Sequence, residues 1–319
     1  MYFEEKRIKN KRYKYIAESI RLPDGSIKKI EKIFKGENKK KLKKFFEKRK
    51  IEEYTKYILK NFKTDHIFTK EQIEKIEEIR LNYQRILRKI PKSNFKDLLD
   101  RFTANFTYES NALEGNSLTL KDVLIIMFEN VSIKGKDLRE IYETRNSRKV
   151  VELIIKNKFK INEEDIIKIH KILVKDTDIK TGYKRFPNII VGKRIKTTPP
   201  ENVKGEMKKL IEWYNENKDK IYPIKLAALF HGRFEQIHPF EDGNGRVGRF
   251  LINVILINNK YLPLIIKKSQ RVSYTTALEK YDDKHSDNLE RFILERFKET
   301  YRKFFEIYVK YVWGNIIFK

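Results

Sequence analysis

From Thr69 onward, the apolar residues of this 319-residue chain recur at helical rather than strand spacing, which constrains the fold more than any other feature. Thr69 can cap a helix that continues to Lys89, and Pro91 stops it because proline cannot sit in a helix interior. The same spacing predicts further helices at 93–115, 134–157, 201–217, 224–236, 246–258, 274–281 and 288–312. Two more helices are expected to begin at Thr119 and after Asn162. The expected fold class is therefore mainly α.

The first 66 residues differ from the rest in pattern and in charge. Alternating residues on both sides of Pro23-Asp24-Gly25 predict a β-hairpin, because proline presets φ and glycine accepts positive φ. A very basic helix is expected from Lys39. We therefore expect three parts: a small basic α+β appendage at 1–66, a main domain at 67–290, and a C-terminal helix and tail at 291–319.

Residues 1–50 carry 19 Lys and Arg against 7 Asp and Glu, which is +12 of the chain's net charge of +27. Such a segment could bind nucleic acid, an anionic membrane surface or an acidic partner. Alternatively, the lysines only solvate the surface, as in proteins rich in Lys and Glu. The sequence leaves both interpretations open.

Composition excludes several classes of protein. The chain has no cysteine, which rules out a disulfide framework, a Cys-ligated zinc or iron–sulfur site, and a cysteine nucleophile. Apolar stretches such as 225–230 and 250–258 are far shorter than the roughly 20 residues that span a bilayer. The first residues lack the apolar core of a signal peptide. We expect a protein of the cytoplasm that makes no membrane contact.

The segment 231–249 carries the strongest chemical signal. An apolar helix delivers His238 at its end, and Pro239 prevents the helix from continuing. The turn Asp242-Gly243-Asn244-Gly245 follows, and Arg246 begins the next apolar helix. A glycine-rich turn before a helix aims several backbone N–H groups and the positive end of the helix dipole at one point. This arrangement favours an anion.

The side chains around this turn are those that phosphate transfer needs. Arg246 and Arg249 lie three residues apart, so both can reach phosphate oxygens from one helix face. Asp242 offers a hard oxygen ligand suited to Mg²⁺. His238 is the type of side chain most readily poised as a general base near neutral pH. Together these residues predict a phosphate-transfer site.

Simpler interpretations of the same residues fit less well. His231, Glu235 and His238 match neither His-Glu-x-x-His nor its inverse, which argues against a catalytic zinc. A calcium loop starting at Asp242 would need glutamate at its twelfth position, where Asn253 stands. A lone histidine is often structural and a glycine-rich turn is often only a turn. The conjunction of base, carboxylate, turn and two arginines in twelve residues favours the phosphate site.

The segment 238–249 resembles, position for position, the signature His-Pro-Phe-x-[Asp/Glu]-Gly-Asn-Gly-Arg-x-x-Arg of the Fic (filamentation induced by cAMP) family of protein adenylyltransferases. The resemblance implies a Fic-type helical core and transfer of AMP from ATP to a Ser, Thr or Tyr hydroxyl of a protein target. It implies that His238 is the general base and that Asp242 holds Mg²⁺. It also implies that the phosphates are bound by Gly243, Asn244, Gly245, Arg246 and, at the γ-phosphate, Arg249.

An upstream segment also resembles a motif of this family. Ser110-Asn-Ala-Leu-Glu114-Gly115 is similar to the inhibitory [Ser/Thr]-x-x-x-Glu-[Gly/Asn] motif of the class with an N-terminal inhibitory helix. The resemblance implies that Glu114 pairs with Arg249, which removes the cation that should orient the γ-phosphate. The plain alternative is an ordinary carboxylate at a helix C-terminus, where the dipole slightly disfavours it.

Two other resemblances are less specific. The segment 181–200 resembles the family's β-hairpin flap, whose residues Ile189, Ile190 and Val191 would align a target segment by strand pairing. Tyr274 is similarly placed to a residue that closes over the adenine, and Asn253 to a ribose or base contact. The resemblance covers about residues 70–295 and leaves the appendage at 1–66 unexplained.

The leading hypothesis is an ATP- and Mg²⁺-dependent protein adenylyltransferase that Glu114 autoinhibits. Within the same class, Glu114 could position a water so that AMP removal dominates, or another nucleotide could be the donor, although Arg249 favours a triphosphate. From other classes, the alternatives are a nucleic-acid-binding regulator that uses residues 1–63 and an assembly protein that uses the tail 316–318. A homodimer is compatible with all of them, and the sequence does not identify the protein target.

Overall fold

The computed structural model describes residues 1–129, 131–188 and 197–313, and these residues are mainly helical, as expected. Contacts divide the chain into two units, Met1–Leu81 and Asn82–Lys319. The division falls inside helix α2 (Lys70–Lys89), later than the boundary expected at residue 66. The change of composition before Thr69 marks only the loop before this unbroken helix, and the C-terminal helices belong to the second unit.

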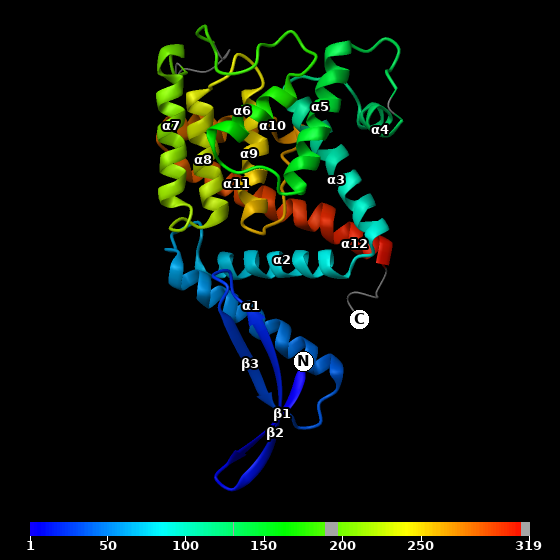
Figure 1. Ribbon diagram of the computed structural model, residues 1–319, viewed down its shortest axis with the longest axis vertical. Coiled ribbons are helices and arrows are strands. Elements are labelled where there is room, and N and C mark those ends of the chain that lie inside the picture. Colours follow the sequence, from blue (N-terminus) through cyan, green and yellow to red (C-terminus); the bar gives the residue numbers. More distant parts are fainter. Residues whose placement is uncertain (130, 189–196, 314–319) are drawn as a thin grey trace. The chain divides into compact units, whose positions relative to one another are not determined.

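The first unit is a three-stranded antiparallel sheet and a helix (Figure 1). The strands are β1 (Tyr2–Ile8), β2 (Lys11–Arg21) and β3 (Ile27–Ile33), in the order β1-β2-β3, and helix α1 spans Lys39–Asn61. The expected hairpin is β2 and β3, and it closes at Gly25, whose φ is 87°. The core of the unit comprises Ile16, Ile20, Ile30, Leu42 and Phe46.

Strand β1 was not predicted from the sequence. It pairs with β2 from Tyr2↔Ala17 to Ile8↔Lys11, but none of its residues is buried. It therefore lacks the alternation of apolar and polar residues that reveals a half-buried strand. The backbone pairing with β2 holds it in place.

The second unit is a bundle of helices (Figure 1), in which residues 174–199 make the long connection between α6 and α7. Two starts are set by the residues that the sequence marks as caps. Thr119 and Asp122 form a reciprocal capping box, and Asn162 Oδ1 accepts from the backbone N–H of Asp165 at 2.7 Å. The helices are α3 (Lys92–Leu113), α4 (Leu120–Phe128), α5 (Leu138–Ile155), α6 (Glu163–Leu173), α7 (Pro200–Asn217), α8 (Pro223–Ile237), α9 (Asn244–Asn258), α10 (Arg271–Asp282), α11 (Ser286–Thr300) and α12 (Glu306–Trp313).

Helix α9 lies at the centre of this bundle. It is buried on all sides from Arg246 to Leu256, and it packs against α3, α5, α6 and α8. A helix that is apolar all round is stable only when neighbours enclose it. The paired helices α8 and α9 therefore hold the loop between them, residues 238–243, on a rigid base. None of the helices in the described ranges is long and apolar enough to cross a membrane.

The expected flap falls largely on residues 189–196, so Ile189, Ile190 and Val191 lie outside the described residues. The two residues that flank this segment bond to each other. Thr197 Oγ1 lies 3.2 Å from the backbone oxygen of Asn188 and 2.9 Å from its Oδ1.

Candidate functional site

The signature segment forms the loop between α8 and α9. Its first residue, His238, adopts a left-handed backbone (φ 50°, ψ 61°), and its N–H donates to the Phe234 oxygen at 2.9 Å. Gly243, with φ 81°, precedes α9 in a conformation that favours glycine. The Asn244 side chain accepts from the Phe240 N–H at 2.9 Å and donates to its oxygen at 2.8 Å. The side-chain amide of Asn244 is thus occupied in closing the loop. Asn244 can therefore offer an anion only its backbone N–H.

The first turn of α9 gathers positive charge at the loop. Its leading N–H groups have no partner within the helix, and the helix dipole is positive there. Arg246 and Arg249 extend from the first two turns, and each is only 2% exposed. The structure thus brings both arginines to the place that the sequence predicts.

Arg249 is held by the last turn of α3. Its Nε donates to Ser110 Oγ at 3.0 Å, and its Nη2 donates to the Ser110 backbone oxygen and to Glu114 Oε1, both at 2.8 Å. Burial alone would lower the pKa of Arg249, but the Glu114 carboxylate, together with Tyr274 and Glu235, more than offsets it and the net effect raises that pKa. The guanidinium is therefore charged, and its Nε and Nη2 are both engaged.

Two glycines make this contact with α3 compatible with the backbone. Gly115, with φ 98°, turns the chain after Glu114. A Cβ at Gly245 would collide with the Glu114 carboxylate and crowd the Arg249 guanidinium. The predicted residues Ser110, Glu114 and Gly115 thus meet the first turns of α9, as the resemblance implied.

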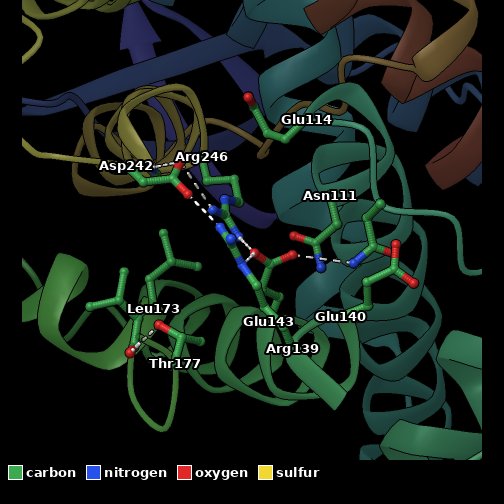
Figure 2. A network of polar contacts seen from close by, with 12 residues as sticks. Asn111, Glu114, Arg139, Glu140, Glu143, Leu173, Thr177, Asp242 and Arg246 are labelled. Atoms are coloured by element: carbon green, nitrogen blue, oxygen red, sulfur yellow. Dashed lines mark hydrogen bonds and ion pairs between the residues drawn. The ribbon is translucent and has the colours of Figure 1, made fainter. Parts of the chain in front are cut away.

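Arg246 and Asp242 share a second network, which is centred on α5 (Figure 2). Arg246 Nη1 lies 2.9 Å from Glu143 Oε1, and Arg139 Nη2 donates to Asp242 Oδ2 at 2.5 Å. Arg139 also contacts Glu143 at 3.3 Å. Sequence analysis missed Arg139 and Glu143, since an Arg and a Glu four residues apart on a helix are an ordinary surface pair.

His238 is backed by a carboxylate that the sequence does not single out as functional. Glu235 Oε2 lies 3.7 Å from His238 Nδ1, and Glu235 Oε1 lies 4.0 Å from His231 Nδ1. His231 Nε2 in turn lies 2.7 Å from the Tyr274 hydroxyl. Glu235 is 5% exposed, so its charge acts on both imidazoles with little screening.

Comparisons with known proteins identify one part of the chain. Residues 160–256 match the model of the Fic/DOC family. The chain contains a Fic domain. Protein adenylyltransferase fic-1 of Caenorhabditis elegans is 30% identical over an alignment 207 residues long. This alignment covers 59% of this chain and 41% of that protein. Protein adenylyltransferase Fic of Drosophila sechellia is 31% identical over an alignment 198 residues long, which covers 60% of this chain and 40% of that protein. The chain thus spans about two fifths of these relatives.

Solved structures confirm the mainly α Fic fold. A Fic domain containing signaling protein from Bacteroides thetaiotaomicron superposes with a TM-score of 0.64 and 27% identity over 73% of this chain and 95% of that chain. A Fic family protein from Desulfovibrio desulfuricans gives a TM-score of 0.63 and 26% identity over 74% of each chain. The expected fold is therefore correct.

Two residues expected at the nucleotide, Asn253 and Tyr274, are buried in the interior of the second unit. The Asn253 amide donates to the Leu264 oxygen at 3.0 Å and accepts from the Leu264 N–H at 2.8 Å, and the residue is 2% exposed. This placement gives Asn253 a structural role in the core, and the ribose or base contact expected for it stays a prediction. Tyr274 is also buried, with its ring 6.0 Å from the guanidinium carbon of Arg249, and burial raises the pKa of its hydroxyl.

The loop of the Fic domain also rests on His170 of α6. The imidazole stacks flat on the Phe240 ring, with centroids 3.9 Å apart, and its Nε2 lies 3.2 Å from the Asp242 backbone oxygen. Burial lowers the pKa of His170 to about 4, which keeps the ring neutral. Sequence analysis did not single out His170, and only the fold places it under the loop.

The residues before the undescribed segment are fastened to the same loop. The Lys184 backbone N–H donates to the Pro239 oxygen at 2.8 Å, and the Asn188 amide donates to the Phe240 oxygen at 2.9 Å. The buried Lys184 ammonium donates to Asn188 Oδ1 at 2.7 Å and to Thr197 Oγ1 at 3.0 Å. The chain on both sides of residues 189–196 is therefore anchored beside His238.

Asp242 fits a magnesium ligand. Its carboxylate is 46% exposed at the mouth of the site, and the described residues contain no group of three His, Asp or Glu that could hold a metal alone. Mg²⁺ typically takes one carboxylate together with substrate phosphates and water, which suits a single aspartate. Arg139 is bonded to Oδ2 of this carboxylate, so it must share or release that oxygen to a metal.

Proposed function

We propose that this chain is a protein adenylyltransferase, which transfers AMP from ATP to a hydroxyl group of a protein target. One observation carries the proposal: His238, Asp242, Arg246 and Arg249 converge on one helix N-terminus inside a Fic domain. The names of the matched relatives support the same activity.

In this proposal, His238 acts as the general base. Its Nε2 takes the proton of a Ser, Thr or Tyr hydroxyl of the target, and the hydroxyl oxygen attacks the α-phosphorus of ATP. The bond from the α-phosphorus to the bridging oxygen breaks, and pyrophosphate leaves. A base must have its lone pair on the nitrogen that faces the substrate. The Glu235 carboxylate near Nδ1 favours the tautomer with the proton on Nδ1, which leaves Nε2 as the base.

The phosphates would be bound by the start of α9. The backbone N–H groups of Asn244 and Gly245 offer hydrogen bonds, and that of Gly243 would join them once it leaves Asp242 Oδ1; the helix dipole also attracts the negative charge. Arg246 and Arg249 supply charge-assisted hydrogen bonds to phosphate oxygens. Asp242 would hold Mg²⁺, which neutralises phosphate charge when bound.

We further propose that the described state is autoinhibited. Nε and Nη2 of Arg249 already donate to Ser110 and Glu114, so a γ-phosphate can bind at Nη2 only after the Glu114 carboxylate leaves. When the γ-phosphate does not contact Arg249, ATP binds in a pose that does not align the α-phosphorus with the incoming hydroxyl. Orientation of this kind is worth several orders of magnitude in rate.

A protein target would dock beside the segment that contains Ile189, Ile190 and Val191. Support comes from the flanks of this segment, because Lys184 and Asn188 attach to the loop next to His238. A target strand that lies along this segment would bring its hydroxyl toward the base.

The proposed reaction is tested by the position of the transferred label. Glu114→Gly protein is incubated with Mg²⁺, a cell extract as target, and ATP labelled at either the α- or the γ-phosphorus. The proposal predicts covalent label on protein from α-labelled ATP only. Label from γ-labelled ATP would identify a kinase, and loss of α-label from pre-labelled protein as the dominant reaction would identify AMP removal. Either result, or no label at all, would overturn the proposal.

A further inference from the structure

The end of the β1–β2 hairpin carries positive charge that the proposed transfer reaction does not use. Strand β3 pairs with β2 only as far as Tyr15↔Ile33, whereas β1 follows β2 out to Ile8↔Lys11. The hairpin therefore continues past β3 as a two-stranded ribbon, seen at the lower end of the blue strands in Figure 1. Four exposed cations, here named the basic tip, occupy it: Arg7, Lys9, Lys11 and Arg12.

Carboxylates of this unit neutralise other cations but not the basic tip. Ion pairs form between Lys6 and Glu31, Lys32 and Glu37, and Lys50 and Glu18, among others on the body of the sheet and on α1. Within the part of the chain that the structure describes, no member of the basic tip takes part in an ion pair. The charge is thus segregated toward one end of the ribbon.

Two features of the basic tip oppose the stability of the hairpin itself. Arg7 stands directly opposite Arg12 in the β1–β2 register, and like charges in such positions repel. The turn residues Lys9 and Asn10 have φ of 43° and 62°. Asparagine and glycine are the usual residues at such positive φ, so a lysine at position 9 strains the backbone. Lys9 also adds a further positive charge to the tip. A polyanion bound at the tip would offset the repulsion.

The shape of the ribbon selects among polyanions. The major groove of B-form DNA admits a two-stranded β-ribbon, and Arg and Lys on such a ribbon reach phosphates and guanine edges. The major groove of duplex RNA is too deep and narrow to admit one. We propose that the basic tip binds double-stranded DNA by inserting the β1–β2 ribbon into the major groove. This function is independent of the transfer reaction.

The test measures binding of the full-length protein to a fluorescent DNA duplex of about 20 base pairs, or roughly two helical turns. The tip variant is Arg7→Ser/Lys9→Ser/Lys11→Ser/Arg12→Ser. A matched variant loses the same charge from α7 and the turn that follows it in the other unit, as Lys204→Ser/Lys208→Ser/Lys218→Ser/Lys220→Ser. We expect the tip variant to bind at least about tenfold more weakly and to reduce the salt dependence of log K by about 0.9 per lost phosphate contact. The DNA affinity of the matched variant should stay within about threefold of wild type. This variant keeps the basic tip and loses only the weak general attraction that depends on net charge.

A single variant separates binding from folding. Arg12→Ser removes the repulsion with Arg7, so it should leave thermal unfolding unchanged or raise its midpoint while it weakens DNA binding. Equal losses in the tip and matched variants would overturn the proposal. So would equal binding of an RNA duplex of the same sequence, or of vesicles of anionic phospholipid.

Discussion

Glu114 Oε1 lies 2.8 Å from Nη2 of Arg249, and this ion pair joins the last turn of α3 to the second turn of α9 across 135 residues of sequence. The arginine is buried, while the Glu114 side chain is 39% exposed. The contact can therefore break by rotation of one exposed carboxylate, without disturbing the core. Because Arg249 is buried and Glu114 is not, we expect the Glu114 side chain to move when the ion pair breaks.

The carboxylate behind the proposed base can be tested separately from nucleotide binding. Glu235→Gln keeps the shape of the side chain but removes the charge near His238 Nδ1. We expect kcat to fall by about tenfold or more, part of the ~10²–10⁴-fold that a general base supplies, with the KM for ATP unchanged.

The tautomer of His238 gives a second readout for the same variant. The chain has five histidines, so the imidazole ¹⁵N signals can be assigned by substitution. The proton of His238 should lie on Nδ1 in wild type and lose this preference in Glu235→Gln. The exposed Glu212→Gln serves as the control. An unchanged tautomer with a reduced kcat would contradict the assigned role.

Arg139 competes with a metal for Asp242. Arg139→Ala frees Oδ2 of this carboxylate, so we expect divalent metal to bind more tightly in the presence of ATP, by about three- to tenfold, as for loss of one modest ion pair. Binding is measured with Mn²⁺ by electron paramagnetic resonance. Arg148→Ala is the matched control, because Arg148 forms a similar i,i+4 pair with Glu152 on the same helix. Equal affinity in both variants would argue that Arg139 does not shield the metal ligand.

Much of this site is visible in the sequence because its parts are contiguous. The residues from His238 to Arg249 make one loop and one helix start, and local turn chemistry dictates both. Glu114 was singled out for a different reason, since the segment from Ser110 to Gly115 resembles a motif of the same family. In both cases a short segment carries the whole signal.

Other features depend on packing between distant segments and leave no local signal. Arg139 and Glu143 become site residues only because α5 lies beside α9. His170 becomes a support for the loop only because Phe240 packs on it. Strand β1 shows the same limit, as its backbone pairing requires no apolar pattern.

Asn253 tests the difference between a nucleotide contact and a structural clamp. Asn253→Ala leaves the Leu264 N–H and C=O buried without their partners, so we expect a loss of about 1–3 kcal/mol in the free energy of unfolding. The KM for ATP should not change. Asn259→Ala, which removes a half-buried amide at the end of α9, should cost less. A higher KM for ATP with unchanged stability would support the nucleotide role.

Lys184 sets a pH dependence of stability. Burial lowers the pKa of its ammonium to about 8, below the value of about 10.4 for an unfolded lysine. Between these values the unfolded chain holds a proton that the folded chain has released, so this residue makes stability rise with pH. Urea unfolding from about pH 8 to pH 9.5 should show a more positive slope for wild type than for Lys184→Met. Lys180→Met, at an exposed lysine nearby, should keep the wild-type slope. Equal slopes in all three proteins would contradict the assignment.

The central claim is that this site transfers AMP and that Glu114 restrains it. The most direct measurement is covalent label on protein from α-labelled ATP and Mg²⁺, compared among wild type, Glu114→Gly, Glu114→Gly/His238→Ala and Glu129→Gly. Glu129 caps the C-terminus of α4 as Glu114 caps that of α3, so it controls for loss of a glutamate at a helix end. The account predicts at least about tenfold more label with Glu114→Gly than with wild type, equivalent to roughly 1.4 kcal/mol. It predicts wild-type label with Glu129→Gly and none with the double variant. Equal label in wild type and Glu114→Gly, or label that survives His238→Ala, would contradict it.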